Sequence, residues 1–118
     1  MTPAQHETLA AGRWQAFSLI EQLANVGSEV ERALNWLDKR NSEYSRLAFL
    51  RALELLHLTI ADPRHRHRLK ELTRLREALL DFFLGDNAFN STGKSWRSYF
   101  YGFAYAAAIL RRAGQLAG

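Results

Sequence analysis

The 118-residue chain contains no cysteine, so neither a disulfide framework nor a thiolate zinc site can hold its fold. It also lacks any apolar run of the roughly 18 residues that a membrane span requires. The N-terminal segment has no basic start and no unbroken apolar core, which excludes the usual form of a signal peptide. We therefore expect a cytoplasmic protein without a membrane-spanning segment.

Alternating strand patterns are missing too, while apolar residues recur at spacings of three and four throughout the sequence. The length and the hydrophobic content of 47% suit a single domain, residues 1–118, built around one core. The predicted fold class is all-α, an up-and-down helical bundle of four long helices plus one short helix.

The helix boundaries are predicted from capping and breaking residues. Asn25-Val26-Gly27 looks like a stop, and Ser28 with Glu31 looks like a capping box that begins a new helix. Asp62-Pro63 ends one helix and begins the next, and Gly85 ends that one. The predicted helices cover residues 3–24, 28–39, 42–61, 63–84 and from about 95 onward, with 28–39 as the short one.

The segment 42–61 is the most apolar of these helices and is predicted to lie at the centre of the fold. Its leucines, its phenylalanine and Tyr44 form two adjacent stripes that occupy most of the helix circumference. A helix of this kind has to be covered on several sides. We expect the other helices to pack around it and Leu53 to lie in the core.

The positive charge of the chain is concentrated in one segment. Residues 64–76 contain six cations and one acid, whereas the rest of the chain contains ten cations and eleven acids. Such a segment can bind phosphate or an acidic partner, and it can equally be a solvated helix face. The candidate anion-binding or nucleic-acid-binding residues are Arg64, Arg66, Arg68, Lys70 and Arg74.

The last helix carries six aromatic residues within positions 96–105, on more than one face. One side is predicted to enter the core and includes Trp96, Tyr99, Phe103 and Leu110. The other side is rich in tyrosine and small residues, a composition typical of close contacts between subunits. Tyr101, Tyr105 and Ala108 are therefore the candidate interface residues of a homodimer, unless the five-helix core buries both sides.

Motifs for catalysis or metal binding are incomplete. Glu54 and His57 have the Glu-x-x-His spacing of di-iron bundles, but the second motif and the additional inward glutamates are missing. Gly93-Lys94-Ser95 resembles the end of a phosphate-binding loop, yet Ala88 stands where that motif requires glycine. We expect no metal, no cofactor and no catalytic residue.

Two family resemblances accompany these patterns. The segments ANVGSEVERALNW, AFLRALELLHLTIADP and RLREALLDFFLGDN resemble a small family of uncharacterised bacterial all-helical proteins, which implies a fold but no activity. A polar turn before an alanine- and leucine-rich helix also resembles the HEPN superfamily of helical dimers. That resemblance implies a ribonuclease pair at Arg51 and His57, with Ala52 standing where those enzymes have a polar residue.

Together these features favour a non-enzymatic helical interaction module of the bacterial cytoplasm that acts as a homo-oligomer, with another protein as a further candidate partner. The alternative is an RNA-binding or HEPN-like ribonuclease-type protein that uses the basic segment 64–76.

Overall fold

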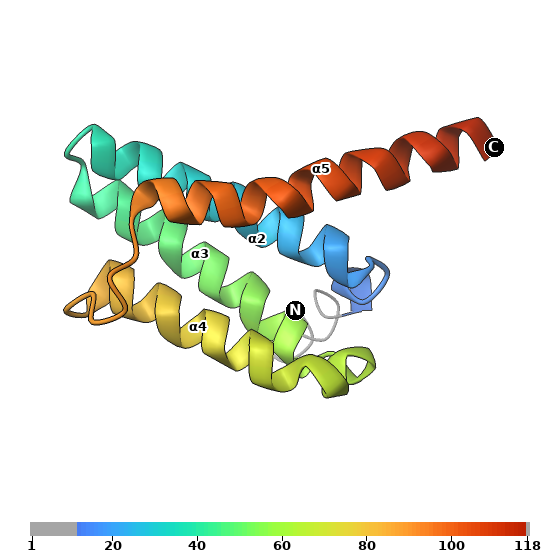
Figure 1. Ribbon diagram of the computed structural model, residues 1–118, viewed down its shortest axis with the longest axis horizontal. Coiled ribbons are helices and arrows are strands. Elements are labelled where there is room, and N and C mark those ends of the chain that lie inside the picture. Colours follow the sequence, from blue (N-terminus) through green and yellow to red (C-terminus); the bar gives the residue numbers. More distant parts are fainter. Residues whose placement is uncertain (1–11, 118) are drawn as a thin grey trace, which may run out of the picture.

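The computed structural model describes residues 12–117, and every element of regular structure in that range is helical. Four long helices and one short helix confirm the predicted fold class (Figure 1). None of the helices described is long and apolar enough to cross a lipid bilayer. The predicted beginning of the first helix at Pro3 lies outside the described residues. In chain order the elements are α2 (Leu19–Asp38), α3 (Ser42–Ala61), the 3-10 helix η1 (Pro63–Arg68), α4 (Leu69–Leu84) and α5 (Gly93–Ala117).

Helices α2 and α3 together occupy the middle of the arrangement, with α5 beside α2 and α4 beside α3. Helix α2 packs against α3 on one side and α5 on the other, and α3 in turn packs against α4 and η1 (Figure 1). The core lies mainly where α2, α3 and α4 meet, and aromatic residues of α5 close one side of it. The fully buried side chains of Val26 and Val30 on α2 and of Phe49 and Leu56 on α3 form its centre.

The predicted break at Asn25-Val26-Gly27 is wrong, because α2 continues through it. The capping box lies ten residues earlier, at Ser18 and Glu21. The Glu21 amide donates to Ser18 Oγ at 3.2 Å, and the Ser18 amide donates to Glu21 Oε1 at 3.1 Å. Ser28 instead lies inside the helix and donates its hydroxyl to the Ala24 carbonyl at 3.3 Å. The predicted short helix 28–39 is therefore the second half of a 20-residue helix.

Helix α3 has the predicted bounds, but it is covered on fewer sides than predicted. The Asn41 side chain caps it by accepting from the Tyr44 amide at 3.0 Å, and the helix ends before Asp62. Tyr44 and Leu47 remain 49% and 57% exposed, and Leu53 is only half-buried. Its neighbours α2 and α4 cover part of the circumference and leave one apolar strip open.

The predicted helix 63–84 is two elements. Its first six residues form η1, in which His65 departs from helical geometry with φ −104° and ψ 20°, and α4 begins only at Leu69. The departure has a local cause, since the Asp62 carboxylate accepts from the Arg64 amide at 3.0 Å and the His65 side chain turns inward.

A compact loop joins α4 to α5. The Asp81 carboxylate accepts from the amides of Ala88 and Phe89 at 2.8 and 3.0 Å, which folds the loop back onto the end of α4. Thr92 and Ser95 then exchange side-chain and backbone hydrogen bonds of 3.0 and 2.9 Å at the start of α5. From there α5 runs antiparallel to α2, and its C-terminal turns extend past the rest of the molecule (Figure 1).

Candidate functional site

Helix α5 approaches α2 closely at one glycine. Phe100 is buried against Gly27, and a Cβ atom added to Gly27 would lie 2.7 Å from the Phe100 Cβ. Any larger residue at position 27 would therefore hold the two helices apart. The glycine that looked like a helix stop in the sequence is required instead by the contact between helices.

Arg97 fastens the first turns of α5 to α2. Its Nε lies 3.1 Å from both carboxylate oxygens of Glu31, and its second terminal nitrogen donates to Asn35 at 3.2 Å and to Asp38 at 2.9 Å. The hydrogen bond to Asp38, followed by that to Glu31, raises the pKa of Arg97 above its ordinary value. The guanidinium thus stays charged, and the helix pair has a fixed register.

The inward side of α5 is narrower than the sequence predicted. Trp96, Phe100 and Ala107 are buried, whereas Tyr99 and Leu110 are 44% and 48% exposed. Partial burial, assisted by the negative charge of Glu71 on α4, raises the pKa of Tyr99. The part of α5 that enters the core is therefore limited to the row of Trp96, Phe100 and Ala107, with Phe103 packed against it.

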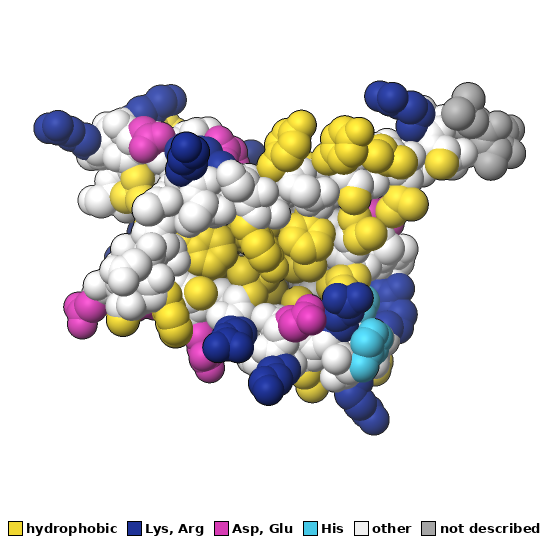
Figure 2. Space-filling view, viewed as in Figure 1, with side chains coloured by type: hydrophobic (Ala, Val, Ile, Leu, Met, Phe, Trp, Pro, Cys, Tyr) yellow, Lys and Arg dark blue, Asp and Glu magenta, His cyan; other side chains and the backbone are white. Residues whose placement is uncertain are grey.

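The predicted interface residues Tyr101, Tyr105 and Ala108 lie together on the outward side of α5. The two tyrosines are 69% and 60% exposed, and Ala108 is exposed as well. The tyrosine rings stack on each other, with centroids 6.3 Å apart and an interplanar angle of 21°. Hydrophobic side chains stand out along the edge of the molecule formed by α5 (Figure 2). We call these three residues the tyrosine stripe.

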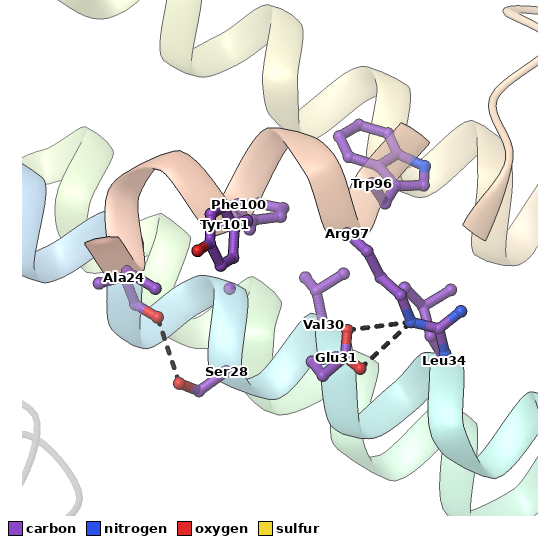
Figure 3. A pocket seen from close by; sticks show the side chains of 11 residues that line it. Ala24, Ser28, Val30, Glu31, Leu34, Trp96, Arg97, Phe100 and Tyr101 are labelled. Carbon is purple, nitrogen blue, oxygen red and sulfur yellow. Dashed lines mark hydrogen bonds and ion pairs between the residues drawn. The ribbon is translucent and has the colours of Figure 1, made fainter. Parts of the chain in front are cut away.

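A groove runs beside this stripe, along the seam between α2 and α5. Its main part has a volume of about 470 Å³ and is flanked by Tyr101, Phe100 and Arg97 on one side and by residues of α2 on the other (Figure 3). A second part of about 320 Å³ continues toward Arg111. Small residues line the section that both parts share: Ala24, Ser28 and Ala104. We call the whole depression the α2–α5 groove.

Within the basic segment, Arg64 differs from the other candidate residues because its guanidinium is bound by other groups of the protein. Arg64 is held by the buried Asp62, with its Nε 3.1 Å from one carboxylate oxygen and a terminal nitrogen 2.7 Å from the other. The same terminal nitrogen donates to the Phe17 carbonyl at 2.7 Å. The hydrogen bonds from Arg64 hold the pKa of Asp62 well below its usual range. Arg64 therefore ties η1 to the residues before α2.

A buried polar network adjoins that ion pair. His65 Nε2 lies 2.9 Å from Gln22 Oε1, and Gln22 donates its amide to the Trp14 carbonyl at 2.9 Å and to Asp62 at 3.2 Å. The Trp14 indole donates to Thr59 at 2.9 Å. Because Gln22 uses its oxygen to accept, His65 donates from Nε2 in its neutral form, and burial lowers the pKa of His65. Sequence analysis missed this network, since its members are separated by about 40 positions.

The other candidate anion-binding residues Arg66, Arg68, Lys70 and Arg74 are all exposed along η1 and the first turns of α4. Arg68 pairs with Glu71 at 3.3 Å. These four side chains are accessible to a ligand, whereas the guanidinium of Arg64 is already engaged.

The pair implied by the HEPN resemblance does not share a helix face. Arg51 and His57 are both exposed on α3, and a separation of six residues at 100° each turns them about 120° apart. Arg51 instead approaches Glu29 of α2 at 3.8 Å. Within residues 12–117, no group of three or more histidine, aspartate or glutamate side chains is arranged to hold a metal ion, and Glu54 with His57 stands alone.

Comparisons with protein-family models, with curated proteins and with solved structures give no match. The resemblances of the sequence therefore stay predictions. The surface features open to a ligand or partner are the tyrosine stripe, the α2–α5 groove and the exposed cations.

Proposed function

We propose that the protein is a non-enzymatic helical interaction module that acts as a homodimer through the tyrosine stripe of α5. The cysteine-free sequence suits a reducing compartment, and we propose the bacterial cytoplasm. The single observation that carries the proposal is the exposure of two stacked tyrosines on a helix that extends past the rest of the molecule.

The tyrosine stripe leaves apolar ring surface in contact with water. Burying apolar surface contributes about 25 cal/mol per Å², and tyrosine combines a large ring with a hydroxyl that tolerates partial hydration. Tyr101 and Tyr105 stack on one another, and no other part of the chain within residues 12–117 covers them. A two-fold axis perpendicular to α5 pairs this side of the helix with the same side of a second copy, and isologous contact of this kind is the commonest form of oligomer.

The test is analytical ultracentrifugation at micromolar concentration. We expect a species of twice 13.5 kDa for the native chain and a monomer for Tyr101→Glu, since a carboxylate at the centre of the contact would be buried without a partner. Tyr44→Glu is the matched control, because Tyr44 is also about half exposed but lies on α3. A native monomer, or a dimer that tolerates Tyr101→Glu, would contradict the proposal.

A second candidate function is binding of RNA through the basic segment, favoured by the exposure of Arg66, Arg68, Lys70 and Arg74. Each phosphate that these cations neutralise releases counterions, so affinity should fall steeply with salt concentration. Replacing all four with glutamine should abolish salt-dependent retention on single-stranded RNA, measured by filter binding. Unchanged retention would exclude this surface. Because Arg64 is engaged by Asp62, it is left unchanged in the variant.

A further inference from the structure

We propose that the α2–α5 groove is the receptor for the tyrosine stripe of a second copy, so that each subunit inserts Tyr101 and Tyr105 into the groove of its partner. This inference rests on the homodimer proposed above. It specifies where the two tyrosines of each subunit are buried and which residues of α2 take part.

The groove and the stripe are neighbours on one surface, which makes that surface complementary to itself. Tyr101 lies at the edge of the groove, with its ring beside Phe100 and above the Ala24 end of α2 (Figure 3). The groove section beyond it is lined by Ala24, Ser28 and Ala104, whose small side chains leave room for a ring. A two-fold axis perpendicular to α5 brings each stripe over the other subunit's groove, and both are then covered together.

The two-fold axis makes the two α5 helices antiparallel. The end of each helix that carries Arg111 and Arg112 then lies beside the end of the other that carries Arg97. Arg97 is held there by Glu31 and Asp38 of its own subunit.

The area that such a contact buries is that of a small, reversible interface. An aromatic side chain buries roughly 150–250 Å². With about two thirds of each ring exposed, the four tyrosine rings of a dimer contribute about 500 Å². The groove surfaces that they cover contribute a similar amount, and the total of about 1,000 Å² is the size of a weak, reversible dimer contact.

Cross-linking tests this geometry directly, because the chain has no cysteine of its own. One preparation carries Ser28→Cys and the other Tyr105→Cys, so that a disulfide between the two can form only between subunits. One of the two preparations carries a mass tag, and on mild oxidation of the mixture we expect the disulfide-linked heterodimer, which a non-reducing gel separates from either homodimer. Leu47→Cys mixed with Tyr105→Cys is the control, since Leu47 is equally accessible but lies on α3.

Filling the groove provides a second measurement. Ala104→Leu places a larger side chain on the exposed groove wall and is expected to weaken dimerisation at least tenfold, with an unchanged helical circular dichroism spectrum. A dimer that forms no Ser28→Cys to Tyr105→Cys cross-link and tolerates Ala104→Leu would overturn the groove assignment and leave the homodimer standing. A native monomer would overturn both the homodimer and the groove assignment.

Discussion

Replacement of Gly27 by alanine probes the contact on which the position of α5 depends. The added Cβ would lie 2.7 Å from the Cβ and 2.8 Å from the Cδ1 of Phe100, whereas carbon atoms in contact are normally about 3.5–4.0 Å apart. Rotation of the Phe100 side chain gives no relief, because its Cβ is fixed to the backbone. The two helices therefore have to separate by about 1 Å.

The expected loss of stability follows from two opposing effects. Overpacking of this kind costs about 1–3 kcal/mol, whereas alanine in place of glycine inside a helix stabilises by about 0.5–1 kcal/mol. We expect a net loss of about 1 kcal/mol for Gly27→Ala, and of about 2.5 kcal/mol at most. With a denaturant dependence of about 2 kcal/mol per M, the urea midpoint measured by circular dichroism falls by about 0.5 M, and by about 1.2 M at most.

Gly102 provides the matched control, since it also lies inside a helix but a Cβ there would meet no atom within 4 Å. Gly102→Ala is expected to stabilise the fold by about 0.5–1 kcal/mol, the opposite sign. If Gly27→Ala stabilises the protein as much as Gly102→Ala does, the argument for close α2–α5 packing is refuted.

Further predictions concern the core and the buried polar network. Leu56→Ala should lower the free energy of unfolding by about 2–5 kcal/mol in urea melts, because Leu56 is fully buried, while Leu47→Ala on the exposed side of α3 should change it by less than about 0.5 kcal/mol. The pKa of His65 is lowered from 6.5, so the unfolded chain binds the proton first and stability should decrease as the pH falls below about 6.5. The pKa of Asp62 is lowered from 3.8, so its contribution is complete above about pH 5 and should be lost as the pH falls through and below 3.8. In Asp62→Asn, the urea midpoint measured as a function of pH should no longer show this decrease at acidic pH. An unchanged decrease would show that other carboxylates cause it.

Capping and breaking residues predicted correctly those helix ends that depend on contacts within a few residues. Asn41 and the Asp62-Pro63 pair fix the ends of α3 by contacts within a few residues, and those bounds are confirmed. Helix α2 was misread because the Ser-x-x-Glu pattern occurs twice, at Ser18 and at Ser28. The second copy follows Gly27, which is required by the close contact with Phe100 of α5. Because Phe100 lies about 70 positions later in the chain, no local pattern reveals that contact.

In the candidate site too, features that depend on a single helix were predicted, and features that depend on distant residues were not. Helical periodicity predicted that Tyr101 and Tyr105 share one exposed face, because that depends on α5 alone. Composition could not separate Arg64 and His65 from the other basic residues, since Arg64 also bonds the Phe17 carbonyl and His65 bonds Gln22, both more than 40 positions earlier. The α2–α5 groove could not be predicted from the sequence either, because it forms only where α2 and α5 pack together.

The attachment of α5 mainly through α2 has a consequence for how the native state opens. Local unfolding follows the boundaries between weakly connected units, and α2, α3 and α4 retain most of the core without the C-terminal half of α5. The backbone amides of those last turns should therefore exchange with solvent deuterium well before those around Val26 and Phe49. If two copies pair along α5, that early exchange slows with rising protein concentration. The order in which the amides are labelled then depends on the protein concentration of the sample.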